Sequence, residues 1–195
     1  AVSELLEAVG LRKHFGEVHA VDDLDVRLHG GVLTSIIGPN GAGKTTLLNI
    51  LSGHTPADGG SIYFLGEDIT RLPVHRRVKR GLNRSFQIMN IFPNLTVFQN
   101  LQIPCLSLKG KSSRVFFNVD AHEDVNEAVW AVLQDIGLFE KRDTLAQALS
   151  HGDQRLLEIG IALASSPSLL FLDEPTAGMN PVERRTILGH IRRMA

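Results

Sequence analysis

The sequence predicts an α/β fold, and three observations support this prediction. A short apolar run at 32–37 is followed by a glycine-rich segment and then by an apolar helical pattern at 45–51. A second apolar run, at 169–172, ends in an acidic pair. Between them, apolar residues recur at helical spacing over 120–136. Short apolar runs that alternate with helical patterns are typical of buried strands in a layered α/β domain.

Three further strands are predicted in the first third of the chain. The first two cover 5–9 and 20–28, and the third covers 61–65. The turn Asp58-Gly59-Gly60 comes directly before the third strand.

The second half of the chain is predicted to be mainly helical. Helices are expected at 96–103, 120–136, 151–164 and from Pro181 onward. Thr96 is a candidate cap for the first of them, and Pro104 a candidate stop. Because α/β segments frame this stretch at both ends, we expect a single domain, 1–195, with an inserted helical subdomain at about 88–165.

The composition is that of a globular protein without a membrane span. The chain has 195 residues, 43% of them hydrophobic and 21% charged, which suffices for one domain with a buried core. The single cysteine, Cys105, excludes an intrachain disulfide and fits a reducing, cytosolic setting. No apolar run approaches the ~18 residues that a membrane helix needs. The first ten residues hold no basic residue, so no signal or transit peptide is expected.

The net charge of −1 conceals a segregation of charge. All 21 acidic residues lie outside 69–119, and nine basic residues lie inside this window. A nucleic-acid-binding protein is usually basic overall, which argues against that class. Charge alone favours a solvated face for the window, and a surface for a partner or an anionic membrane is the alternative.

A phosphate-binding loop is the first chemical motif. Gly38-Pro39-Asn40-Gly41-Ala42-Gly43-Lys44-Thr45 matches the pattern G-x-x-x-x-G-K-[ST], between a predicted strand and a predicted helix. Glycines let successive backbone N–H groups converge on an anion, and the helix N-terminus adds its dipole. We expect Lys44 to reach the β- and γ-phosphates and the Thr45 hydroxyl to bind Mg²⁺.

The acidic pair Asp173-Glu174 is the second motif. A carboxylate at the carboxyl end of a buried strand lies at the edge of the sheet where ligands bind. Asp173 is predicted to hold Mg²⁺, and Glu174 to act as the general base for the attacking water. With the phosphate loop, this pair indicates an enzyme that hydrolyses or transfers a Mg-nucleotide phosphate.

The residues between these motifs resemble the ATP-binding-cassette ATPases. Leu149-Ser150-His151-Gly152-Asp153-Gln154-Arg155 is similar to the LSGGQ-type signature of that family, with His151 in place of a glycine and Asp153 in place of a glutamine. Phe15 is similar to the aromatic residue that stacks on adenine, and Gln87 to the glutamine of the Q-loop. Ala177-Gly178-Met179-Asn180 occupies the D-loop position. The motifs follow one another in the family's order over essentially the whole chain.

Four segments resemble one subgroup of that family, the ATPase subunits of importers for branched-chain amino acids and related amides. They are NRSFQ at 83–87, FPNLTV at 92–97, LSHGDQR followed by LEI at 149–159, and AGMNP at 177–181.

The resemblance implies a fold and a set of site residues. The expected fold is a P-loop nucleotide-binding core with an antiparallel β subdomain, and the expected ligands are ATP and Mg²⁺. Glu174, Gln87 and Lys44 would be catalytic, and Thr45, Gln87 and Asp173 would hold the metal. ATP would contact Phe15, the loop from Gly38 to Thr45, and Thr46, together with Ser150 and Gly152 of an opposite subunit.

The resemblance also implies partners and a location. A second ATP-binding subunit would complete each site, and transmembrane permease subunits would dock through the helical subdomain, linked indirectly to a solute-binding protein. This raises the expectation that the basic window faces a partner. The chain would lie on the cytoplasmic face of the plasma (inner) membrane, and no nucleic-acid partner is expected.

Two other functions stay open at this stage. One is a soluble cassette ATPase that acts on nucleic acid or ribosomes, although its usual coiled-coil insertion or duplicated cassette is absent here. The other is a GTPase or small-molecule kinase, although the guanine-reading N-K-x-D is absent.

The C-terminus departs from the family pattern. Only 15 residues follow Asn180, whereas the family continues with a further strand and a switch histidine. His190 lies within the last predicted helix, too early for that role. The expectation is a C-terminally truncated cassette with weak or no steady-state hydrolysis on its own, and with turnover restored by a longer C-terminus.

Overall fold

A computed structural model describes residues 3–85, 91–108 and 123–194, and the chain divides into two compact units. We call residues 3–84 the β unit and the described part of 85–194 the helical unit. The β unit holds β1 (Glu4–Phe15), β2 (Val18–His29), α1 (Lys44–Ser52), β3 (Gly59–Phe64), β4 (Glu67–Asp68), α2 (Val74–Lys79) and all but the last residue of β5 (Leu82–Ser85). The helical unit holds α3 (Val97–Leu108), α4 (Glu123–Asp135), the 3₁₀ turns η3 (Phe139–Lys141) and η4 (Ala146–Ala148), α5 (His151–Leu163), β6 (Leu169–Leu172) and α6 (Pro181–Met194).

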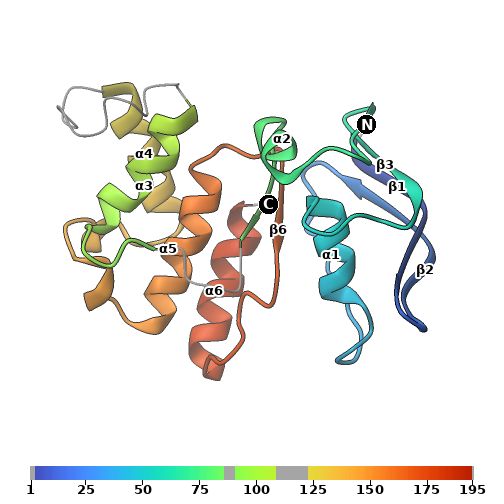
Figure 1. Ribbon diagram of the computed structural model, residues 1–195. Helices are drawn as coiled ribbons and strands as arrows, with labels where there is room; N and C mark the ends of the chain where they lie inside the picture. The colour runs from blue at the N-terminus through green and yellow to red at the C-terminus, as the bar shows by residue number, and fades with distance from the viewer. Residues whose placement is uncertain (1–2, 86–90, 109–122, 195) are drawn as a thin grey trace. The chain divides into compact units, whose positions relative to one another are not determined.

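An antiparallel sheet in the order β2-β1-β3-β4 forms the frame of the β unit (Figure 1). β1 and β2 make a long hairpin, in which Glu4 lies opposite His29 at one end and Phe15 opposite Val18 at the other. Alternate strand residues point to the same face, and the fully buried residues of the unit include Leu6, Leu11, Ile50, Leu51, Ile62 and Phe64. The three strands predicted here are confirmed, and both hairpin strands extend beyond their predicted bounds.

Asp58 ties the hairpin to the turn before β3. Lys13 Nζ donates to Asp58 Oδ1 at 2.7 Å, and the His14 backbone N–H donates to Oδ2 at 2.7 Å. These hydrogen bonds, that of Lys13 first, hold the pKa of the Asp58 carboxyl below its usual range.

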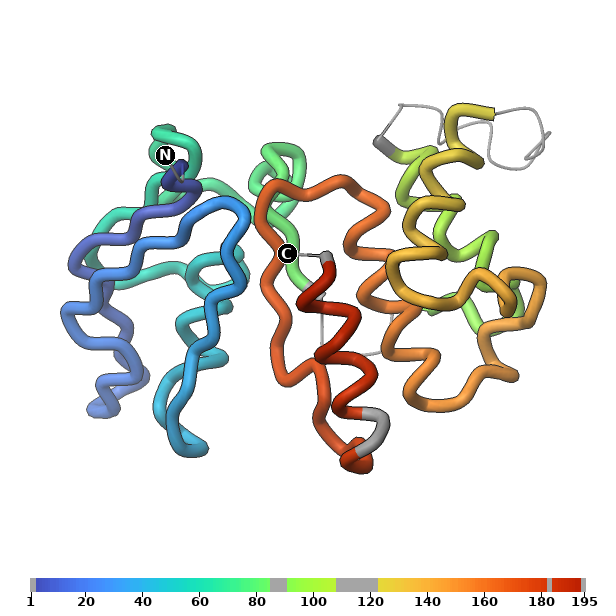
Figure 2. The backbone as a smooth tube through the Cα atoms, turned by 180° about the vertical axis from the view of Figure 1, so that it is seen from behind, coloured from blue at the N-terminus to red at the C-terminus, as the bar shows by residue number. Residues whose placement is uncertain are grey.

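The strand predicted at 32–37 is wrong. Val32–Ile37 belongs to no regular element and pairs with no strand among the described residues. The side chains are exposed, 51% for Val32 and 90% for Ile37. The segment runs extended from β2 towards α1 (Figure 2). An apolar run supplies β propensity, but a strand also needs a neighbour for its N–H and C=O groups.

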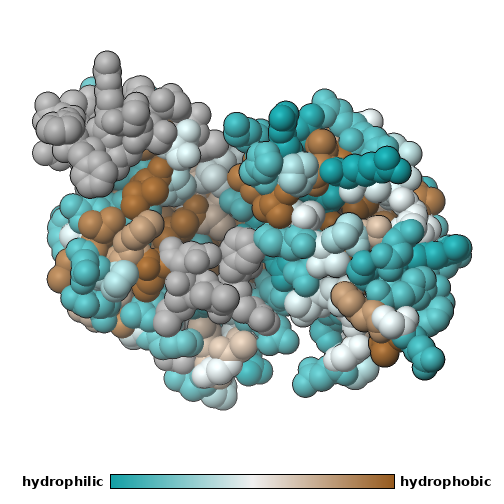
Figure 3. Space-filling model, viewed as in Figure 1, coloured by the Kyte–Doolittle hydropathy of each residue, from teal (hydrophilic) through white to brown (hydrophobic). Residues whose placement is uncertain are grey.

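The helical unit has its own hydrophobic core. Buried residues of α3, α4, α5 and α6 form it, among them Val97, Leu101, Val125, Val129, Leu133, Leu157, Ile159, Ile187 and Ile191. Figure 3 shows that hydrophobic side chains also reach the visible surface of this unit. The helix predicted at 151–164 is confirmed as α5, and α6 begins at Pro181 as predicted. The helix predicted at 120–136 is confirmed as α4 from residue 123 onward, and 120–122 lie outside the described residues.

α3 begins with a capping box. Gln99 N–H donates to Thr96 Oγ1 at 3.2 Å, and Thr96 N–H donates to Gln99 Oε1 at 2.9 Å. The prediction that Pro104 ends this helix is wrong, since α3 continues past it and Cys105 is buried in the core. Burial of the following turn offsets the cost of proline inside the helix, roughly 3 kcal/mol.

The mixed α/β fold class with an antiparallel sheet is confirmed. Among the described residues, no helix combines the length and the apolar character needed to cross a membrane.

Candidate nucleotide site

The predicted phosphate loop is shaped by glycines in front of α1. Gly41 and Gly43 have φ of +82° and +78°, a backbone region that other residues rarely adopt. A Cβ on Gly43 would also overlap the carbonyl oxygen of Ala20 on β2. Gly43 is therefore required both by its conformation and by the close approach of the sheet.

Lys44 curls back over this loop. Its Nζ donates to the carbonyl oxygens of Gly38 and Pro39, at 2.7 Å each. α1 has no side-chain cap at its start, so the N–H groups of its first turn are left for an anion. Thr45, in that turn, is exposed, and Thr46 is half-buried. A phosphate in the loop would offer Lys44 a charged acceptor in place of the two carbonyls.

The other end of α1 is held by Arg77, which the sequence reasoning missed. Its Nη1 donates to the carbonyls of Ile50 and Leu51 at 2.9 and 2.7 Å. Nε and Nη2 donate to the carbonyls of Leu72 and Thr70 at 2.9 and 3.0 Å. Burial lowers the pKa of Arg77 to about 10, so the side chain still carries its charge to the helix C-terminus at neutral pH.

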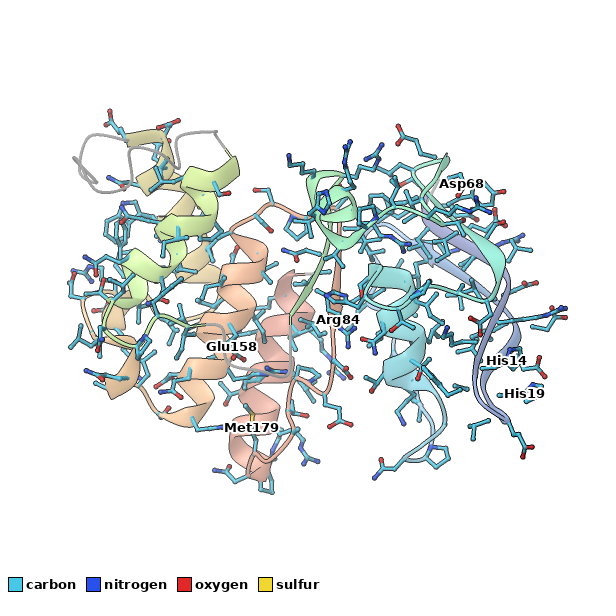
Figure 4. The ribbon with its side chains drawn as sticks, viewed as in Figure 1. His14, His19, Asp68, Arg84, Glu158 and Met179 are labelled. Carbon is cyan, nitrogen blue, oxygen red and sulfur yellow. The ribbon has the colours of Figure 1, made fainter. Side chains whose placement is uncertain are left out.

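Arg84 is a second buried arginine beside α1 (Figure 4). Its Nη1 donates to Asn49 Oδ1 at 2.5 Å. Sequence reasoning had placed both arginines in the basic window as surface charges. Nothing in the local sequence separates buried Arg77 from its exposed neighbour Arg76.

Phe15 ends β1 with 54% of its surface exposed. Lys13 Nζ lies 5.5 Å from the ring centroid. The ring is thus accessible for stacking on a flat apolar ligand such as a nucleobase.

Asp173 and Glu174 follow β6 directly and differ in their surroundings. Asp173 is 4% exposed, and its backbone carbonyl accepts a hydrogen bond from Arg155 Nη2 at 3.0 Å. Glu174 is exposed and has a φ of +44°. A residue other than glycine in this left-handed region costs of order 1–3 kcal/mol, and such strain concentrates at functional sites.

Arg155 connects the signature helix to this acidic pair. Its Nη1 donates to Glu158 Oε2 at 2.6 Å, one turn further along α5, where Glu158 is 7% exposed (Figure 4). The i,i+3 spacing of Arg155 and Glu158 was visible in the sequence. Their burial and the contact with Asp173 were not.

The signature residues begin α5. Ser150 is the N-cap, and its Oγ accepts from the Asp153 N–H at 3.2 Å. Lys141 Nζ lies 2.5 Å from Asp153 Oδ2 and offsets that negative charge. Gly152 is buried and His151 exposed. The first N–H groups of the helix have no partner within α5, which suits an anion.

Each unit holds a distinct part of the predicted site. Phe15 and the phosphate loop belong to the β unit, and Ser150, Gly152 and the acidic pair to the helical unit. Gln87 lies outside the described residues, as do Lys109, Lys111 and Arg114 of the basic window.

Comparisons with known proteins give one consistent result. The model of the ABC transporter family matches residues 21–177. The probable branched-chain amino acid transport ATP-binding protein LivG of Archaeoglobus fulgidus is 36% identical over 190 residues, which cover 95% of this chain and 73% of that protein. LivG of Escherichia coli K12, a high-affinity branched-chain amino acid transport ATP-binding protein, is also 36% identical, over 94% of this chain and 74% of its own length.

An export protein is nearly as similar. The lipopolysaccharide export system ATP-binding protein LptB of Escherichia coli K12 is 34% identical over 96% of this chain and 75% of its own length. Among solved structures, the ADP conformation of the ATP-binding cassette MJ1267 aligns with a TM-score of 0.84 at 33% identity, covering 98% of this chain and 77% of that one.

Proposed function

This chain belongs to the ABC transporter family and is an ATPase of the ATP-binding-cassette type, and from this premise we propose that it powers an importer for branched-chain amino acids or a related small amide or amino-acid solute. The observation that carries the proposal is the similarity to LivG proteins of two organisms along nearly the whole chain. The four subgroup segments in the sequence agree with it.

We assign the chemistry to the residues of the candidate site. Backbone N–H groups of the loop and of α1 would hold the phosphates, and Lys44 would neutralise the charge that develops on the γ-phosphate. Glu174 would accept a proton from the attacking water. Its exposure and its strained backbone, φ +44°, favour this role over a structural one. Gln87 would orient the water or the metal, and Phe15 would stack on adenine.

Mg²⁺ fits the donor set. The Thr45 hydroxyl, the Asp173 carboxylate and the Gln87 amide oxygen are hard oxygen ligands, which Mg²⁺ prefers. When bound, Mg²⁺ would neutralise charge between the β- and γ-phosphates. The hydrogen bond from Arg155 to the Asp173 carbonyl would keep the backbone of this ligand in place.

We propose that the site is completed by a second subunit. The start of α5, with Ser150 and buried Gly152, would face the γ-phosphate held by the partner's loop. Permease subunits would bind the helical unit on the cytoplasmic face of the membrane, and a solute-binding protein would act through them.

Substitution of Glu174 by Gln tests the assignment of the base. The variant should bind ATP as the parent does but lose nearly all turnover, and it should accumulate as an ATP-bound dimer. ATP binding, phosphate release and sedimentation measure the three effects. Glu140→Gln, at an exposed glutamate, is the matched control and should behave as the parent. Turnover of Glu174→Gln at the parent rate would exclude Glu174 as the base.

The solute is tested separately, by reconstituting the chain with its membrane subunits in liposomes. Import predicts ATP-dependent uptake of radiolabelled leucine in the presence of the solute-binding protein. The similarity to LptB makes lipopolysaccharide the competing cargo. ATPase activity that responds to lipopolysaccharide and not to leucine would reject the importer while leaving the ATPase assignment intact.

A further inference from the structure

Two histidines and an aspartate meet at the end of the β1–β2 hairpin. His14 Nε2 and His19 Nδ1 are 3.1 Å apart, and the two rings meet edge to face at 86° (Figure 4). Asp22 Oδ2 lies 3.9 Å from His19 Nδ1. One ligand atom from each of the three residues lies within 4.8 Å of the others.

This spacing is close to that of a metal chelate. Two imidazole nitrogens that each bind one tetrahedral ion at ~2.0–2.1 Å stand about 3.3 Å apart. We propose that His14, His19 and Asp22 form a binding site for a borderline divalent transition-metal ion of the Zn²⁺ type, with water as fourth ligand. Imidazole nitrogens suit Zn²⁺, Ni²⁺ and Cu²⁺, whereas Mg²⁺ prefers oxygen. The site is therefore chemically distinct from the Mg²⁺ of the nucleotide site.

The hairpin preorganises the two imidazoles. His14 and His19 are direct partners in the antiparallel register, which sets their Cβ atoms about 5 Å apart. Asp58 accepts the backbone N–H of His14, and its Oδ2 lies 3.6 Å from His14 Nδ1, the ring nitrogen that does not face His19. A carboxylate behind a metal-binding imidazole is a common second partner that orients the ring.

Little rearrangement separates the metal-free and metal-bound forms. Without the ion, one of the two facing nitrogens carries a proton and donates an N–H···N hydrogen bond to the other. On metal binding the donor ring would shift that proton to its other nitrogen, so that both neutral imidazoles present a lone pair to the ion. The side chains are accessible to the ion, with His14 35% and His19 60% exposed.

Competition titration with a chromogenic Zn²⁺ chelator tests the proposal on the whole chain. The parent should take up one Zn²⁺ that His14→Ala and His19→Ala bind at least ~10-fold more weakly, since loss of an outer partner alone costs ~10–100-fold. His75→Ala, at an exposed histidine of α2, is the control and should bind as the parent. Unchanged metal-free unfolding of each variant shows that folding is intact.

A second readout locates the ion without any substitution. Zn²⁺ should protect His14 and His19, but not His75, from diethyl pyrocarbonate, as followed by mass spectrometry of the peptides. The proposal is overturned if the parent binds no Zn²⁺, if His14→Ala and His19→Ala bind it as tightly as the parent, or if the three histidines are protected equally.

Discussion

Arg155, the last residue of the signature segment, makes two contacts that its position in the sequence does not indicate. It pairs with buried Glu158 and also donates to the backbone carbonyl of Asp173. The side chains of the pair are only 11% and 5% exposed, so the buried Glu158 carboxylate relies on Arg155 for compensation of its charge. Asp173 and the signature helix are thereby joined through one guanidinium.

Arg155→Met should destabilise the fold by about 3–5 kcal/mol, because it leaves the Glu158 carboxylate buried without its partner. The double variant Arg155→Met/Glu158→Met should recover most of that loss. Urea unfolding measures both. Arg71→Met, at an exposed arginine, serves as control and should stay within ~0.5 kcal/mol of the parent. If the losses in free energy of unfolding of the two single variants simply added in the double variant, Arg155 and Glu158 would not be coupled.

Residues of the candidate site differed in how well they could be predicted. The phosphate loop could be predicted because the residues that bind phosphate follow one another directly in the sequence. The φ of Glu174 and the Arg155–Asp173 contact could not, because they depend on backbone geometry and on partners distant in sequence. Ser150 was predicted from the resemblance, and its capping of α5 by way of Asp153 follows from the ordinary preference of serine for helix starts.

At the scale of elements, α1 depends on a side chain of α2 as well as on its own sequence. Arg77 binds carbonyls at its C-terminal end and ties them to the segment before α2. Leu72 and Thr70 supply the acceptors on that segment. The helix that carries Lys44 at its start is thus fixed at its far end by a side chain from another element.

Arg77→Met should cost about 3 kcal/mol, since several carbonyls lose a charged donor together. Arg77→Lys should recover only part of this, because a single ammonium cannot copy the planar fork of donors. Thermal unfolding and ATP affinity are the measurements, and both should worsen. Arg76→Met, one residue earlier and exposed, is the control. Parent-like stability of Arg77→Met would show that the fork contributes little.

Helix and strand predictions failed where context outweighed local pattern. The hairpin and α4 to α6 could be predicted, since their patterns are long or their starts are marked. The predicted strand at 32–37 failed because apolar character does not provide a pairing neighbour. The predicted stop at Pro104 failed because Cys105 and Leu106 are buried in the core.

At the scale of the molecule, the basic window is less uniform than its sequence. Arg77 and Arg84 are buried beside α1, and Arg80 pairs with Glu67 at 2.8 Å. Arg71, Arg76 and Lys79 are exposed on or near α2. In the described part of the window, therefore, part of the positive charge stabilises the β unit rather than facing a partner.

We expect protein molecules in concentrated solution to associate through the exposed apolar segment 32–37. Ile37→Glu should slow the growth of light scattering in concentrated solution, because it places a charge in an exposed apolar extended segment. Val18→Glu, at a residue 65% exposed but paired in the sheet, adds the same charge, is the matched comparison and should have less effect. Equal slowing by both variants would assign the effect to net charge alone.

The exposed segment also determines how the protein must be handled. A net charge of −1 gives neighbouring molecules little electrostatic repulsion. Exposed apolar side chains favour association of these molecules, and three of them lie in this segment, each at least half exposed: Val32, Leu33 and Ile37. Colloidal stability, rather than resistance to unfolding, should set the usable concentration. Buffers chosen away from the isoelectric point, near 6.8, are the first remedy, and added salt would weaken what repulsion remains.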